Sequence, residues 1–151
     1  MTSIVYIYAD FAKGNKKNMK AFHIEIVTPD GLAYSGEVES LLVRTQDGDI
    51  EILAGHTDLI ASLSTGRARL IVDGKSKFAS VNGGFLSVNR GEVKLCAITF
   101  EFAEDIDLNR AKEAKAKAEA ALSAARDDRD VRIAKAKLAR AALRIDVAGM
   151  K

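Results

Sequence analysis

The chain has 151 residues, of which 48% are hydrophobic and 29% charged, a balance typical of a globular protein with one modest domain or two small ones. It contains no run of about 18 apolar residues, so no membrane-spanning helix is expected. Its single cysteine, Cys96, excludes a disulfide framework within the chain and fits a reducing compartment.

Residues 1–18 differ from the rest of the chain. They contain a short apolar patch, but they lack the basic start and small-residue cleavage signal of a secretory peptide and the arginines of a transit peptide. We expect this leader to be a disordered tail or the product of a miscalled start, with Met19 as the alternative first residue.

Residues 19–103 show the two-residue period of β-strands. Phe22, Ile24 and Ile26 alternate with less apolar neighbours, and Pro29-Asp30-Gly31 then provides the fixed and left-handed φ values of a turn. Asp73-Gly74 suits a type I′ turn between two twisted strands. The pattern therefore predicts a series of short antiparallel strands.

Further turns are expected at Asn82-Gly83-Gly84 and Asn89-Arg90-Gly91. Gly83-Gly84 also resembles a phosphate-binding loop, but no helix follows it, which favours a tight β-turn. The strands predicted between these turns span residues 38–45, 67–72, 75–81, 85–88 and 92–100.

After Phe102 the apolar period changes from 2 to 3.6, which predicts two amphipathic helices. The polar segment 126–130 separates them; its aspartates can cap the second helix, and Asp105 or Asp107 can cap the first. Each helix carries one apolar stripe, formed by Ala111, Ala114, Ala118, Leu122 and Ala125 and by Val131, Ala134, Leu138, Ala142 and Ile145.

These patterns predict a β + α fold class. An N-terminal antiparallel β-sandwich or flattened barrel, residues 19–103, precedes a C-terminal two-helix antiparallel hairpin, residues 104–151. Most stripe residues of the hairpin are alanines, and each alanine in place of leucine forgoes roughly 2 kcal/mol or more of burial and packing. We therefore expect a hairpin that forms helix readily but can leave its docking place; a permanently docked hairpin is the alternative.

Basic residues are concentrated near the C-terminus. From Val131 onward Asp146 is the only acid, so the last helix is a basic rod on a protein whose net charge is only +2. One interpretation is a nucleic-acid-binding module, although the rod has no aromatic residue to stack on bases. The cations of the rod are Arg132, Lys135, Lys137, Arg140, Arg144 and Lys151.

No catalytic motif is present: the chain has no G-x-S-x-G, P-loop, H-E-x-x-H or cysteine pair, and no catalytic or metal-binding residue is predicted. His23 fits a surface or packing position on a strand. His56 lies on a probable loop and is the better functional candidate of the two histidines.

Four segments in order resemble the epsilon subunit of bacterial F-type ATP synthases. They are IVTPDGLAYSGEVESLLV, DGDIEILAGHTDL, VNGGFLSV and EDIDLNRAKEAKAKAE, and the likeness covers residues 19–151. The resemblance implies a non-catalytic rotor subunit of the central stalk, peripheral to the cytoplasmic face of the bacterial cell membrane. Its β-domain would bind the gamma subunit and the c ring, coupling proton flow to ATP synthesis.

The resemblance also implies that the helical hairpin acts as a movable brake on ATP hydrolysis. When extended, it would contact the beta (and alpha) subunits in the catalytic head. The residues expected to meet an acidic segment of the beta subunit are Arg132, Lys135, Lys137, Arg140 and Arg144.

A c-ring contact is implied for Asp49, Gly55 and His56, which match or nearly match the family pattern G-E-x-G-x-L-P-G-H-x-P-L. Three positions depart from it. Glu51 stands where glycine is usual, and Ala54 and Asp58 stand where prolines are usual, so this surface loses two φ constraints and gains two acids.

No cofactor is implied as required, but ATP is implied as a regulatory ligand that holds the hairpin folded. The stretch from Ile106 to Ala111 fits the motif I/L-D-x-x-R-A, and Lys117 stands where some ATP-binding members have arginine. The residues implied in ATP binding are Glu101, Ile106, Asp107, Arg110, Ala111, Arg140 and Arg144. From the residues alone, Asp107 can equally be a helix cap and Arg110 a member of surface ion pairs.

Overall fold

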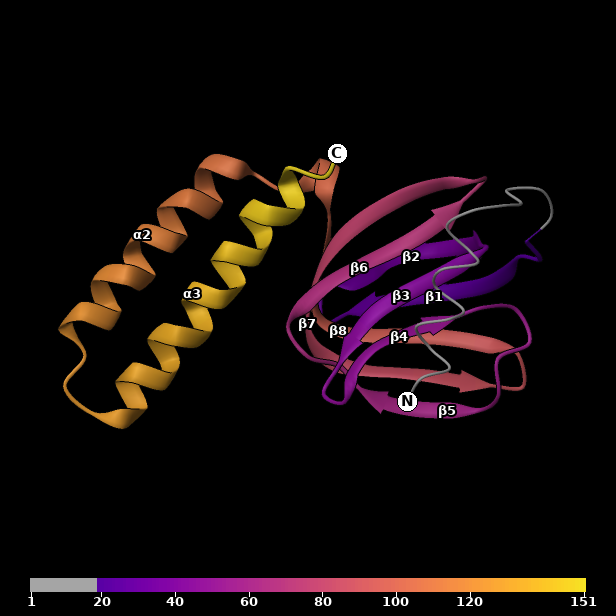
Figure 1. The fold of residues 1–151 in the computed structure, drawn as a ribbon, viewed down its shortest axis with the longest axis horizontal. Coiled ribbons are helices and arrows are strands. Elements are labelled where there is room, and N and C mark those ends of the chain that lie inside the picture. Colours follow the sequence, from indigo (N-terminus) through magenta and orange to yellow (C-terminus); the bar gives the residue numbers. More distant parts are fainter. Residues whose placement is uncertain (1–18) are drawn as a thin grey trace.

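The computed structural model describes residues 19–151 (Figure 1), and the prediction for the leader lies outside these residues. Eight strands are followed by a short 3₁₀ helix and two α-helices, which confirms the predicted fold class. The strands are β1 (Phe22–Thr28), β2 (Gly31–Val38), β3 (Ser40–Thr45), β4 (Gly48–Ile52), β5 (Leu59–Ser62), β6 (Gly66–Val72), β7 (Lys75–Asn89) and β8 (Glu92–Phe102). The helices are η1 (Ala103–Asp105), α2 (Leu108–Ala124) and α3 (Asp128–Ala148).

The strands form one sheet that curls into a sandwich, with the order β2-β1-β8-β7-β6-β3-β4 and with β5 paired to β7. Every pair is antiparallel except β1 and β8, which run parallel. The prediction of an antiparallel sandwich is thus confirmed with one parallel pair added. Because β1 and β8 lie far apart in sequence, no turn signal could have indicated their pairing.

Strand β7 is longer than predicted, because Gly83-Gly84 lies inside it and does not form a turn. The strand pairs with β6 before the two glycines and with β5 after them, while β8 pairs with it on both sides of the glycines, from Ala79 to Asn89. Both glycines have positive φ, +60° and +100°, and a Cβ on Gly84 would lie 1.9 Å from the carbonyl oxygen of Cys96. The pair therefore bends the strand where the sheet changes layers.

The segment 38–45 also differs from its prediction as one strand. Glu39 separates β2 from β3, and its amide donates to the carbonyl of Ile71 at 2.7 Å, so the chain changes pairing partner at this residue. The hairpin turns predicted at Pro29-Asp30-Gly31, Asp73-Gly74 and Asn89-Arg90-Gly91 are present. Asp73 and Gly74 have φ of 50° and 72°, as a type I′ turn requires.

Large aliphatic side chains fill the sandwich. The largest fully buried ones are Ile24, Ile26, Leu41, Ile52, Leu70, Leu86 and Leu95. They come from strands of both layers, so the sheet has one continuous core.

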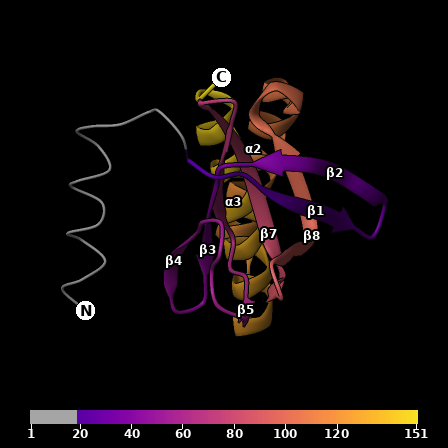
Figure 2. The same ribbon diagram turned by 90° about the vertical axis from the view of Figure 1, so that its right-hand side faces the viewer.

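The two α-helices pack against each other, and α3 lies against the sandwich along β7 and β6 (Figures 1 and 2). Both predicted caps are present: Asp107 accepts from the amide of Arg110 at 3.0 Å, and Asp127 accepts from the amide of Asp130 at 2.8 Å. Among residues 19–151, no helix has the length and hydropathy needed to cross a membrane.

The stripe predicted on the second helix is out of phase near its end. Ala141 is buried and Ala142 is exposed, the reverse of what the predicted stripe requires. The end of α3 packs into a second, small cluster formed by Ala103, Ile106, Val147 and Ala148, with Phe78 and Leu143 against it. This cluster joins the hairpin to η1 and β7.

Candidate functional site

A cavity of about 450 Å³ lies between the sandwich and the hairpin. Its walls come from four elements, with β7 and β8 on one side and α2 and α3 on the other. It is lined by Ser80, Val81, Asn82, Thr99, Glu101, Ala114, Lys117, Ala118, Ala121, Lys137, Arg140, Ala141, Leu143 and Arg144. The many alanines leave space here that larger side chains would fill.

Three of the residues predicted to bind ATP meet in this cavity: Glu101, Arg140 and Arg144. Glu101 comes from β8, and the two arginines lie one turn apart on α3, so folding brings them together across more than thirty residues. Two further cations, Lys117 of α2 and Lys137 of α3, also line the wall. The result is one acid facing four basic side chains.

The other predicted ATP-binding residues lie at the start of α2 and do not line this cavity. Asp107 caps the helix, Arg110 is exposed, and Ile106 and Ala111 are buried, at 4% and 0% exposure. Their positions fit a structural role for Asp107, Ile106 and Ala111 and leave the Arg110 side chain in solvent.

An ion pair crosses the boundary between the two parts of the chain. Arg144 donates from Nε and from an Nη atom to the two carboxylate oxygens of Glu101, at 2.7 and 3.0 Å, and both side chains are partly buried. Such two-pronged pairing is geometrically specific. Among residues 19–151, the remaining cavity cations Lys117, Lys137 and Arg140 have no acidic partner within ion-pair distance.

Polar groups of the sheet form the cavity floor. Ser80 is buried, and Asn82 and Thr99 face each other on β7 and β8. The hydroxyl of Thr65 donates to Oδ1 of Asn82 at 2.7 Å, which fixes the orientation of this amide. The cavity thus combines a cationic helix wall with hydrogen-bonding groups on the strands.

The sequence prediction of the nucleotide site missed the polar floor residues Ser80, Asn82 and Thr99 and also Lys137, which was predicted only as a beta-subunit contact. For Lys137 the signal was present in the spacing. Lys137, Arg140 and Arg144 recur at i, i+3 and i+7, which places them on one face of α3.

The residues predicted to contact the c ring lie at the two ends of β4. Asp49 is in β4 next to the β3–β4 turn, whereas Gly55 and His56 are in the loop between β4 and β5. Gly55 has φ of +79°, a value that favours glycine. The His56 Nδ1 atom lies 2.8 Å from the carbonyl oxygen of Thr57.

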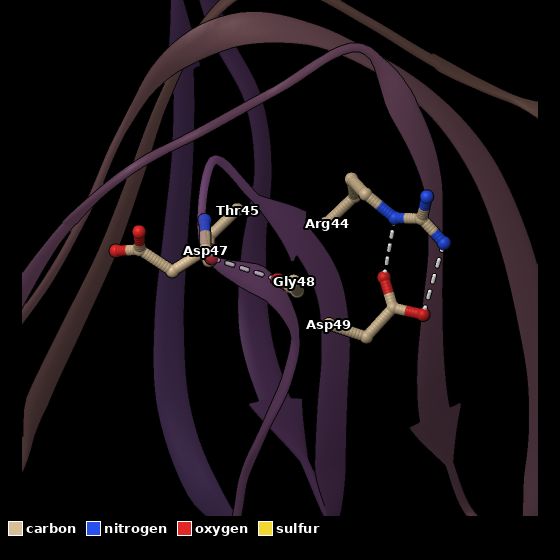
Figure 3. Close-up of polar contacts among 5 residues, drawn as sticks. All are labelled: Arg44, Thr45, Asp47, Gly48 and Asp49. Carbon is tan, nitrogen blue, oxygen red and sulfur yellow. Dashed lines mark hydrogen bonds and ion pairs between the residues drawn. The ribbon is translucent and has the colours of Figure 1, made fainter.

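Asp49 is held by Arg44, as Figure 3 shows. The guanidinium donates to both carboxylate oxygens, at 2.6 and 3.1 Å, and this hydrogen bond raises the pKa of Arg44 above its usual value. In the adjoining turn, the Thr45 hydroxyl donates to the carbonyl of Gly48 at 2.7 Å and accepts from the amide of Asp47 at 3.2 Å. The turn and the carboxylate are therefore both fixed by local hydrogen bonds.

The two additional acids of this surface also have partners. Glu51 lies opposite Arg69 across β3, with an oxygen 3.4 Å from an Nη atom, and accepts from the buried Ser40 hydroxyl. Asp58 accepts from the amide of Arg90 at 2.8 Å. Both carboxylates therefore interact inside the chain.

Comparison with known proteins identifies the family. The model described as "ATP synthase, Delta/Epsilon chain, beta-sandwich domain" matches residues 21–103, and "ATP synthase, Delta/Epsilon chain, long alpha-helix domain" matches residues 104–149. The chain belongs to the ATP synthase delta/epsilon chain family. The predicted resemblance to the epsilon subunit of bacterial F-type ATP synthases is thus confirmed.

Two relatives of this family are ATP synthase epsilon chains from bacilli. The chain of Bacillus velezensis is 45% identical and that of Bacillus subtilis 42% identical, each over 131 residues that cover 87% of this chain and 99% of the relative. A solved structure of Euglena gracilis mitochondrial ATP synthase (OSCP/F1/c-ring) contains a chain with a TM-score of 0.70 and 22% identity, covering 95% of this chain and 94% of that one. The last match shows likeness of fold.

The basic rod of this delta/epsilon family member is divided between two environments. Arg132, Lys135 and Lys137 are exposed, whereas Arg140 and Arg144 are half-buried against the cavity. The exposed Lys137 also borders the cavity, so three cations predicted to contact the beta subunit line it in the docked hairpin.

One outer face of the sandwich carries apolar side chains. Ile60 is 77% exposed, Phe85 47% and Ile98 58%. Ser62 pairs with Phe85, and Phe85 pairs with Cys96, so the three apolar residues share one face of β5, β7 and β8. Within residues 19–151, no group of three or more His, Cys, Asp or Glu side chains could hold a metal ion.

Proposed function

We propose that this chain is a non-catalytic coupling and regulatory subunit of the ATP synthase central stalk. Its sandwich contacts the gamma subunit and the c ring at the cytoplasmic face of the membrane, and its hairpin inhibits ATP hydrolysis when it leaves the sandwich. One observation supports the proposed regulatory role of the hairpin. The cavity and the proposed beta-subunit contact use the same cations, Lys137, Arg140 and Arg144.

The cavity suits a polyphosphate. Its helix wall presents four cations from α2 and α3, and arginine side chains bind phosphate oxygens with two parallel hydrogen bonds. The floor groups of Asn82 and Thr99 are placed to hydrogen-bond the less charged part of a nucleotide. ATP bound here would connect both helices to the sheet and so favour the docked hairpin.

The docked and extended hairpins would then exclude each other. In the docked state Arg144 pairs with Glu101, and Arg140 faces the cavity. Contact with an acidic segment of the beta subunit requires these cations to leave the sheet. ATP therefore shifts the population away from the inhibitory state through its differential affinity for the docked one.

The sandwich offers two separate contact surfaces. The apolar face of Ile60, Phe85 and Ile98 fits the gamma subunit, because subunit interfaces bury apolar side chains at their centre. The region of Asp49, Gly55 and His56 is polar and fits the c ring, the contact implied by the family pattern. One rigid sandwich can thus join the shaft to the ring.

Calorimetric titration of the isolated chain with ATP tests the ligand. We expect heat of binding for the natural chain and at least a tenfold loss of affinity for Arg140→Ala, since a charge-assisted phosphate contact contributes about 1.5–3 kcal/mol. Arg132→Ala, on the same helix but exposed, is the matched control and should bind as the natural chain does. Absence of heat at millimolar ATP rejects the nucleotide site.

Truncation tests the brake. ATP synthase assembled with a chain that ends at Phe102 should hydrolyse ATP faster than the complex with the full chain, because the inhibitory hairpin is gone. Equal hydrolysis rates would reject an inhibitory role, provided that the truncated chain co-purifies with gamma and the c ring.

A nucleic-acid-binding module has less support. The docked hairpin half-buries Arg140 and Arg144 and leaves Arg132, Lys135, Lys137 and Lys151 as the exposed cations of the predicted rod. A steep salt dependence of affinity for DNA or RNA in a filter-binding assay would favour this alternative.

A further inference from the structure

The loop between β4 and β5, residues 53–58, carries two of the proposed c-ring contact residues without the help of proline. The chain has one proline, Pro29, and it lies elsewhere. Ala54 and Asp58 occupy positions where the family pattern has proline, so no fixed φ restricts the loop. Another interaction must limit its conformations if Gly55 and His56 are to be presented in one arrangement.

The first half of the loop is closed locally. The amide of His56 donates to the carbonyl of Leu53 at 3.1 Å, and Ala54 packs against the sandwich core. These contacts fix the chain up to His56 and do not involve the second half.

The second half is tied to a distant turn by Asp58. Its Oδ1 atom accepts from the backbone amide of Arg90 at 2.8 Å, across 32 residues of sequence. Arg90 is the first residue of the two-residue β7–β8 turn, which Asn89 and Glu92 close as the last strand pair. The amide at this turn position has no partner in the strand ladder, so it is free to donate to Asp58.

The hydrogen bond between Asp58 and the Arg90 amide lies at the junction of the loop and β5. Leu59 follows immediately, begins β5 and pairs with Val88 of β7. Since β5 has only four residues and, among the strands of residues 19–151, pairs with β7 alone, its start is the point at which the loop could shift. The carboxylate therefore fixes the end of the loop and the start of the strand at once.

We infer that Asp58 is a positioning residue: its hydrogen bond to the Arg90 amide holds the loop of Gly55 and His56 in the shape that meets the c ring, in place of a proline constraint. The tie itself is independent of the proposed function, whereas its purpose rests on the proposed ring contact. Two measurements test separately whether the hydrogen bond exists and whether it serves the ring contact.

Amide hydrogen exchange by NMR tests the tie. In Asp58→Ala the Arg90 amide should exchange about tenfold faster, which corresponds to losing one hydrogen bond to a charged acceptor. Asp58→Asn keeps an acceptor oxygen at the same reach and should retain most of the protection. Thr57→Ala, an exposed neighbour, is the matched control and should leave the rate unchanged. An unchanged Arg90 rate in Asp58→Ala overturns the inference.

Rebinding to ATP synthase from which this subunit has been removed tests the purpose. We expect His56→Ala and Asp58→Ala both to weaken rebinding severalfold and Asp58→Asn to stay close to the natural chain. If His56→Ala weakens rebinding and Asp58→Ala does not, the ring contact stands and the positioning role is wrong. If His56→Ala has no effect, the proposed contact of His56 is wrong, and the exchange rates alone decide whether the tie exists.

Discussion

The sandwich and the helical hairpin bury side chains of very different size in their interiors. The sandwich buries seven isoleucine and leucine side chains completely, whereas the two helices bury mainly alanines: Ala111, Ala118, Ala134 and Ala141. Because the free energy of burial is proportional to the apolar area removed from water, the core of the sandwich contributes more stability than the alanines of the hairpin.

The contacts that dock the hairpin on the sandwich are concentrated near the C-terminal end of α3. Val147 is fully buried and Ile106 nearly so in the small cluster beside η1, and the Glu101–Arg144 pair lies one turn earlier on α3. Folding of the sheet and docking of the hairpin therefore have separate energetic origins. A change at the end of α3 should therefore release the hairpin without unfolding the sheet.

The largest effect is expected in the sandwich. Leu95→Ala, which removes a side chain with 0% exposure, should lower the free energy of unfolding by about 3 kcal/mol. Chemical denaturation measures this loss. Leu32→Ala, at a side chain that is 64% exposed, should change stability by about 0.5 kcal/mol or less. Equal losses for both variants would contradict the assignment of the core.

Next in size is the release of the hairpin. Val147→Ala should weaken docking by about 2 kcal/mol, because a fully buried valine loses most of its apolar contacts. Hydrogen exchange should rise in α2 and α3 while the slowest amides of the sheet stay unchanged. Ile133→Ala, at a residue of α3 that is 44% exposed, is the control. Equal acceleration in the sheet would show that the two parts unfold together.

A smaller effect is expected at the start of α2. Asp107→Ala removes the cap and should cost about 1 kcal/mol of helix stability, visible as faster exchange of the first-turn amides. Asp105→Ala should have little effect, since Asp105 lies in η1 and does not cap the helix. If the Asp105 variant loosened α2 as much, the cap would not be the cause.

The smallest effect is expected at Arg44. This exposed ion pair with Asp49 should contribute less than about 1 kcal/mol, and Arg44→Ala should show it in denaturation. The pKa of Arg44 is raised by Asp49, so its contribution is complete at lower pH and is lost only as the pH rises through that raised pKa. The difference between variant and natural chain should stay constant from about pH 6 to pH 9. A difference that varies over this range would point to another group.

Local chemistry made much of the fold predictable. The turn at Asp73-Gly74 and the two helix caps depend on residues within a few positions of one another. The turn is as predicted, and the caps, Asp107 and Asp127, are among the aspartates that the sequence offered for each helix. Gly83-Gly84 was misassigned because a tight turn and a bend inside a strand both require positive φ. Only the pairing of β7 with β8 on both sides of the glycines distinguishes them.

The phase of the second helix shows a similar limit. Ala141 and Ala142 are chemically identical, so the sequence indicates a stripe but not which of the two alanines is buried. Lys137 was likewise recognised as part of a basic rod, while its position on the cavity wall depends on how α3 rests on the sheet.

By itself, the amino-acid sequence determined the two-part organisation, the helix caps, the hairpin turns and the family. These follow from turn conformations, from periodicity and from motifs that act over short distances. Only the tertiary structure decided that Glu101 meets Arg144 across 43 residues and that Asp58 meets the amide of Arg90 across 32. Such contacts depend on which strands and helices become neighbours, and the burial of the whole apolar core determines that arrangement.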